Sequence, residues 1–113
     1  MLILIVLLLG CYHKAPEPSF DMSLVLPSDS MVVLITDLQL ADGAVNILAK
    51  QGKPKTEYAS AFTQQVLEKH NVSEESFTES LRYYSFHIEK MDKIYEEVIN
   101  RLGTLESEVH QKD

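Results

Sequence analysis

Apolar residues recur along the middle of the chain at alternating spacings of three and four. From about residue 28 to residue 50 the repeat consists of Leu34, Leu38, Ala41, Val45 and Leu48, with Met31 and Ile35 beside it. This spacing places apolar side chains on one face of an α-helix. We predict that Ser28 caps the start of this helix and that Gly52 and Pro54 end it.

Two shorter helices are predicted after this first one. From about Lys55 to His70 a second apolar face is formed by Tyr58, Ala59, Phe62, Val66 and Leu67. Asn71 offers a left-handed stop, and Ser73 is the predicted cap of the next helix, with Glu74 and Glu75 in its first turn. The third helix is short, and Phe77, Leu81 and Tyr84 share one of its faces.

The most regular pattern lies in the last part of the chain. Its apolar positions are Ile88, Met91, Tyr95, Val98, Leu102, Leu105 and Val109, and the opposite face carries Glu89, Lys90, Lys93, Glu96 and Glu97. This pattern predicts a long amphipathic helix. We therefore expect an all-α domain over residues 28–109, a small bundle of three to four amphipathic helices, followed by a tail at 110–113.

The N-terminus carries a different pattern, an unbroken apolar run from Leu2 to Leu9 that ends at Gly10 and Cys11. A membrane-spanning helix needs about 20 apolar residues, so the run is too short to span. As a buried strand it has no partner strand elsewhere in the sequence. A short apolar run that ends in small residues is typical of a signal peptide, which we assign to residues 1–10.

The residues Leu8-Leu9-Gly10-Cys11 resemble the lipobox of bacterial lipoproteins. The resemblance implies that Cys11 receives a diacylglycerol and becomes the first residue of the mature chain, which anchors the protein to a membrane. Tyr12 stands where the retention rule of enteric bacteria would want Asp, which favours the outer membrane. The absence of acidic residues immediately after Cys11 favours its periplasmic side over the cell surface.

The segment 11–27 contains Pro16, Pro18 and Pro27 and is predicted to be an extended tether. Fully extended, such a segment reaches on the order of 40 Å.

Two segments, LPSDSMVVLITDLQLADGAVN and VLEKHNVSEESFTESLRYYSFHIEKMDKIYEEVINRL, closely resemble the small Bacteroidota lipoproteins grouped as domain of unknown function 4296. The first matches through Asp37, Leu38, Leu40, Ala41 and Asp42, and the second through Lys69, His70, Val72, Ser73, Phe77, Ser80, Leu81, Tyr83 and Tyr84. Family members often have Pro where this chain has Ile88. Without that Pro, the third and fourth helices either break near His87 or run together.

Composition and motifs exclude several kinds of chemistry. The net charge of -7 and the lack of a basic patch argue against binding to nucleic acid. Asp37 and Asp42 lie five residues apart on one helix and point in directions that differ by about 140°. We therefore expect Asp37 to accept a hydrogen bond from a neighbouring helix cap or tyrosine. His70 and His87 lie near helix ends, where they suit capping, and no metal-binding or catalytic motif accompanies them.

The leading hypothesis is a lipid-anchored, non-enzymatic helical module of the cell envelope that binds a protein or peptide partner. It involves no cofactor and no small-molecule substrate, and its candidate interaction surface includes Asp37, Asp42, Tyr83 and Tyr84, although aromatic residues at helical spacing are more often core. The alternative is a periplasmic chaperone-like factor that holds unfolded clients. An enzyme would require Asp37, His70 and a tyrosine within hydrogen-bonding reach.

Overall fold

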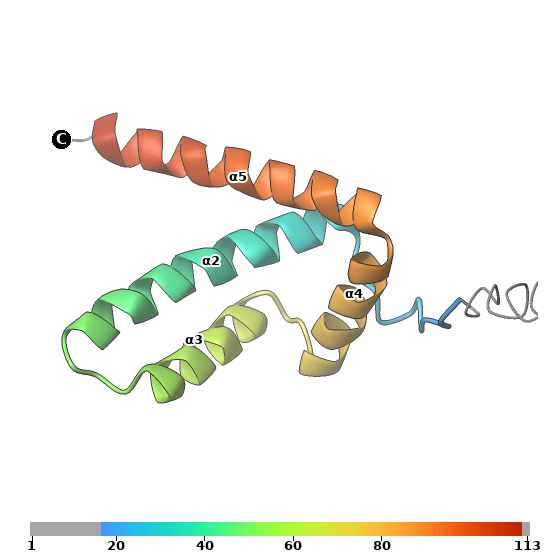
Figure 1. The fold of residues 1–113 in the computed structure, drawn as a ribbon, viewed down its shortest axis with the longest axis horizontal. Coiled ribbons are helices and arrows are strands. Elements are labelled where there is room, and N and C mark those ends of the chain that lie inside the picture. The colour runs from blue at the N-terminus through green and yellow to red at the C-terminus, as the bar shows by residue number, and fades with distance from the viewer. Residues whose placement is uncertain (1–16, 112–113) are drawn as a thin grey trace, which may run out of the picture.

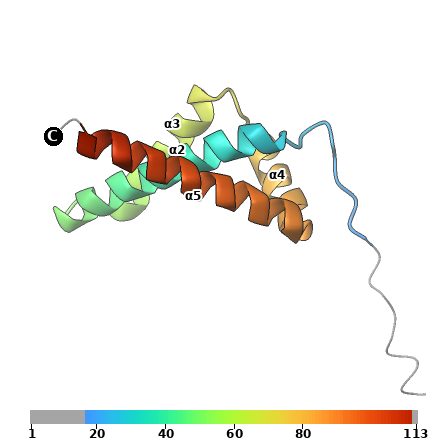
Figure 2. The ribbon, with the colours of Figure 1, turned by 90° about the horizontal axis from the view of Figure 1, so that it is seen from above.

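The computed structural model describes residues 17–111, which form four helices and no strand. The helices are α2 (Ser28–Lys50), α3 (Lys55–Lys69), α4 (Glu74–Phe86) and α5 (Ile88–Gln111). Helix α2 packs against both α3 and α5, and α4 joins α3 to α5 at one end of the bundle (Figure 1). Helices α2 and α5 begin at that same end and run in the same general direction (Figure 2). The predicted all-α bundle is confirmed.

Helix α2 supplies most of the core. The side chains of Met31, Leu34, Ile35 and Val45 are buried, as its apolar repeat predicts. Within residues 17–111, α2 is the helix long and apolar enough to cross a membrane by length and composition. The central helix of a bundle meets the same criterion, because it needs apolar side chains toward neighbours on more than one side.

Two residues with positive φ end the first two helices. Gly52 (φ 84°) follows α2, and the backbone N–H of Lys53 donates to the carbonyl oxygen of Leu48 at 3.1 Å. Asn71 (φ 54°) follows α3, and Val72 N–H donates to Leu67 O at 2.9 Å. These backbone hydrogen bonds satisfy carbonyls that a helix end otherwise leaves without partners. The predicted stops at Gly52 and Asn71 are confirmed.

The two predicted helix caps differ in outcome. Ser73 caps α4, because its hydroxyl accepts a hydrogen bond from Ser76 N–H at 3.0 Å. The prediction for Ser28 is wrong: Pro27 is the cap residue of α2, and no side chain caps that end. Ser28 is the first helical residue, and its hydroxyl lies 3.5 Å from the Tyr84 hydroxyl.

The third and fourth helices are separate, with a break at His87 (φ -94°, ψ 74°). The backbone N–H of His87 donates a hydrogen bond to Tyr83 O in the last turn of α4. The His87 carbonyl oxygen accepts one from Met91 N–H at the start of α5. The His87 ring packs against the ring of Tyr83 at 4.5 Å between centroids. A single residue therefore turns the chain, and no proline is required.

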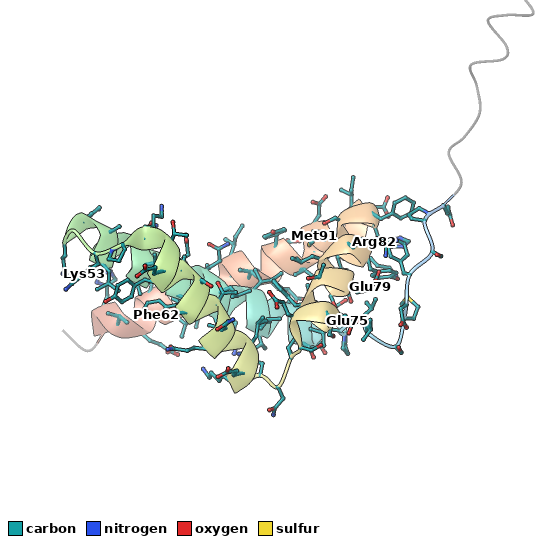
Figure 3. All side chains as sticks on the ribbon, turned by 90° about the horizontal axis from the view of Figure 1, so that it is seen from below. Lys53, Phe62, Glu75, Glu79, Arg82 and Met91 are labelled. Carbon is teal, nitrogen blue, oxygen red and sulfur yellow. The ribbon has the colours of Figure 1, made fainter. Side chains whose placement is uncertain are left out.

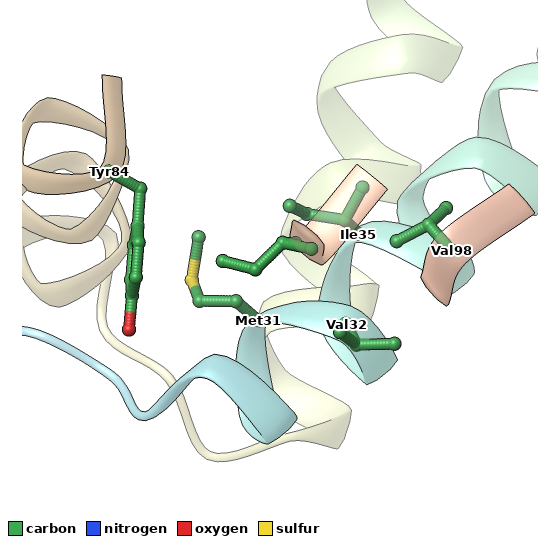
Figure 4. Packing of buried hydrophobic residues seen from close by; sticks show 6 residues of the cluster. Met31, Val32, Ile35, Tyr84 and Val98 are labelled. Atoms are coloured by element: carbon green, nitrogen blue, oxygen red, sulfur yellow. The ribbon is translucent and has the colours of Figure 1, made fainter. Parts of the chain in front are cut away.

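A buried hydrophobic cluster joins α2, α4 and α5 through Met31, Val32, Ile35, Tyr84, Ile94 and Val98 (Figure 4). The predicted contact face of α5 is only partly correct. Val98 is buried and Met91 packs against the cluster, but Ile94, which is outside the predicted face, is buried as deeply as Val98, with 2% of its surface exposed. Ile88, Tyr95 and Val109, which belong to the predicted face, are exposed instead. The apolar arc of α5 is therefore wider than its contact with the bundle, and one edge faces solvent.

Candidate interaction surface

Asp37 joins α2 to the end of α3. Its carboxylate accepts hydrogen bonds from His70 Nε2 at 2.6 Å and from Lys69 Nζ at 3.2 Å. Burial raises the pKa of the Asp37 carboxyl, but the hydrogen bonds from His70 and Lys69 outweigh burial and hold its pKa below the ordinary value of 3.8. His70 is the cap residue of α3, so the predicted structural role of Asp37, accepting from a neighbouring helix cap, is confirmed.

Within the described residues, no tyrosine hydroxyl is hydrogen-bonded to Asp37 or His70. Within residues 17–111, the tyrosine hydroxyls that form hydrogen bonds are those of Tyr83 and Tyr84, and their partners are Lys90, Ser28 and Leu26. The same part of the chain contains no group of three His, Cys, Asp or Glu side chains placed to hold a metal ion. The Asp37–His70 pair therefore connects two helices.

Asp42 lies on the exposed surface of α2, at the edge of a hollow of about 260 Å³ between α2, α3 and α4. Its lining is mostly apolar and includes Leu38, Phe62 and Phe77. In the described residues Asp37 and Asp42 share no hydrogen-bond donor.

Tyr83 and Tyr84 have different surroundings. Tyr84 is 4% exposed, and its hydroxyl donates to Leu26 O at 2.7 Å. Tyr83 is half-buried; its ring packs edge-on against Phe20 at 5.3 Å, and its hydroxyl accepts from Lys90 Nζ at 2.9 Å, which raises the pKa of Lys90. Both tyrosines therefore hold the segment that precedes α2, and Tyr84 is a core residue.

Serines on α4 hold the same segment, a role that sequence reasoning missed. Ser80 is fully buried, and its hydroxyl accepts from Leu26 N–H at 2.9 Å while it donates to Ser76 O at 2.7 Å. The Ser76 hydroxyl donates to Leu24 O. The i, i+4 spacing of Ser76 and Ser80 on one helix face was the available signal, but nothing local identified their partners more than fifty residues away.

Arg82 extends this contact toward the N-terminus. It pairs with Glu79, donates to Ser19 O at 2.8 Å, and stacks over the Phe20 ring at 4.7 Å. Figure 3 shows Arg82 and Glu79 on α4 near this segment. The predicted tether boundary at Pro27 therefore shifts toward the N-terminus, because residues 19–26 are bound along α4 and are part of the folded domain.

A half-open cavity of about 410 Å³ lies where this segment meets the starts of α2 and α5. Val32 and Ile94 contribute apolar walls, and Lys90, Lys93 and Glu97 are charged residues of the lining. Tyr83 and Tyr84 also line it, so the two tyrosines of the predicted interaction surface do lie together.

An aligned set of exposed apolar residues lies on α5. Ile88, Tyr95 and Ile99, which we call the α5 stripe, are 66%, 44% and 67% exposed. Offsets of seven and four residues place them within about 40° on one side of the helix and along about 16 Å of its length. Isolated exposed apolar residues are normal, but an aligned set on one helix face is typical of an interaction site. Sequence reasoning assigned Ile88 and Tyr95 to the core face and missed Ile99.

Residues 23–108 match the model of a protein family described as Domain of unknown function (DUF4296). The match covers most of the chain and all of α2, α3 and α4, so the chain belongs to this family. No curated protein and no solved structure matches it. The apolar N-terminal segment is compatible with a signal sequence; that segment and Cys11 lie outside the described residues.

Proposed function

We propose that this protein is a lipid-anchored, non-enzymatic module of the bacterial cell envelope that binds another protein through the α5 stripe. The observation that carries this proposal is the exposure of Ile88, Tyr95 and Ile99 along one face of a helix whose neighbouring face, with Ile94 and Val98, is packed in the core. Apolar side chains in that arrangement gain free energy when a partner removes them from water.

The anchoring part of the proposal is supported by the Gly10–Cys11 pattern and by the contact between residues 19–26 and α4. Only the seven residues between Cys11 and Ser19 remain as a tether, and the eight Cα–Cα steps from Cys11 to Ser19 span at most about 29 Å. The α4–α5 end of the domain would then stay close to the periplasmic face of the outer membrane. Mass spectrometry of the native N-terminal peptide tests this step, and an unmodified Cys11 would refute the anchor.

The non-enzymatic part of the proposal is supported by the chemistry of the titratable pair. The Asp37 carboxylate is engaged by both His70 and Lys69, which suits a link between helices. A general base, in contrast, must lie within hydrogen-bonding reach of the proton that it removes from a bound substrate.

Site-specific photo-crosslinking in the native, lipidated chain tests partner binding. A photo-reactive residue replaces Ile99 on the stripe or, as the matched control, Glu97 on the opposite side of α5. We expect a discrete adduct with another envelope protein from position 99 and none from position 97. Equal labelling from both positions would refute the stripe as a binding site. A broad smear of adducts, with suppressed aggregation of an outer-membrane client, would instead favour the chaperone-like alternative.

A further inference from the structure

The charges beside the α5 stripe are of one sign. Glu89, Asp92, Glu96 and Glu106 are exposed and, at 100° per residue, project within about 100° of the stripe. Glu106 lies 3.8 Å from His110, which belongs to the same side of the helix. Carboxylates therefore border the stripe along one side, and Glu106 lies about two turns beyond its end, whereas Met91 and Leu102 on its other side pack against the core.

The basic residues of α5 lie elsewhere. Lys90, Lys93 and Arg101 project about 140° or more away from the stripe, where Glu97 and Glu108 are mixed among them. Charges of both signs are thus mixed on the side of α5 opposite the stripe, whereas the charges beside the stripe are carboxylates. The stripe combines exposed apolar residues with an acidic border over about three helical turns.

We infer that the α5 stripe binds the apolar face of a cationic amphipathic helix in the partner protein, an inference that rests on the proposed function. Three turns of such a helix would cover Ile88, Tyr95 and Ile99, and Lys or Arg side chains along one of its flanks would meet the carboxylates. A second copy of this chain is a poorer occupant, because its net charge is -7 and its own stripe carries the same acidic border.

Two synthetic helical peptides with the same leucine stripe, one flanked by lysines and one by glutamates, test this inference. Their binding to the lipidated full chain in phosphatidylcholine nanodiscs is measured by fluorescence anisotropy, with empty nanodiscs as the blank. We expect the lysine peptide to bind at least about tenfold more tightly, and its binding to weaken as salt rises. The Ile99→Gln substitution should weaken binding as well.

Reversing charges on either side of α5 shows which carboxylates cause the preference for the lysine peptide. Asp92→Lys combined with Glu96→Lys should abolish or reverse the preference for the lysine peptide. Glu97→Lys combined with Glu108→Lys changes the net charge equally on the other side of α5 and should preserve that preference. Equal binding of both peptides, absence of binding, or the same effect from both double variants would overturn the inference. So would a crosslinked homodimer from position 99. If the peptide measurements fail but a discrete crosslink to another envelope protein forms at position 99, the proposed function still holds.

Discussion

Replacing Asp37 with Asn tests whether the Asp37–His70 contact holds α3 on α2. The substitution keeps the side-chain volume but removes the charge that accepts from His70 at 2.6 Å and from Lys69 at 3.2 Å. A hydrogen bond to a charged group contributes about 1.5–3 kcal/mol. The Lys69 side chain is 70% exposed and adds little, and the Asp37 and His70 side chains are 24% and 22% exposed. We therefore expect the free energy of unfolding to fall by about 1–2 kcal/mol at neutral pH.

The pH dependence of this loss follows from the pKa of Asp37. Because the folded protein holds this pKa below its ordinary value of 3.8, the carboxylate stabilises the fold above that value. The stabilisation disappears as pH falls through 3.8 and the lower folded pKa. The difference between the wild-type protein and Asp37→Asn should accordingly be constant above about pH 5 and shrink as pH falls through 3.8 and below.

Urea unfolding followed by far-UV circular dichroism measures both effects. Asp42→Asn is the matched control, because Asp42 lies on the same helix, is exposed, and should change stability by no more than about 0.5 kcal/mol. Equal unfolding free energies for the two variants would refute the structural role of Asp37. A difference that persists unchanged at low pH would refute the electrostatic explanation.

Three further predictions concern stability and are tested by the same unfolding measurement. Ser80→Ala should lower the free energy of unfolding by about 1–2 kcal/mol, because it leaves the partly buried Leu26 N–H without an acceptor, and an unchanged value would contradict the bound N-terminal segment. Gly103→Ala should raise the free energy of unfolding by about 0.4–1 kcal/mol, because Gly103 is helical and an added Cβ would meet open space. Gly52→Ala should lower it, because φ is 84° at that position. A change of the same sign in both variants would refute this difference between the two glycines. Ile94→Ala should lower the free energy of unfolding by about 2–5 kcal/mol, because Ile94 is buried, whereas Ile99→Gln on the exposed face should lower it by no more than about 0.5 kcal/mol. Similar losses from both substitutions would contradict the orientation of α5.

The sequence by itself determined the helices and most of their ends. Apolar spacing predicted each helical segment, and local backbone chemistry predicted the stops at Gly52 and Asn71 and the cap at Ser73. These features depend on residues within a few positions of one another, so they can be inferred without knowing the fold. Ser28 was mispredicted because the fixed φ of Pro27 lets the proline itself occupy the cap position.

Only the tertiary structure decided which side of α5 is buried and what the N-terminal segment contacts. The apolar arc of α5 is wider than one contact face, so its neighbours in the bundle determine that Ile94 is buried and Tyr95 is exposed. Likewise, Asp37 meets His70 across 33 residues, and Leu26 meets Ser80 across 54. Such contacts arise from how helices pack, which periodicity within one helix does not specify.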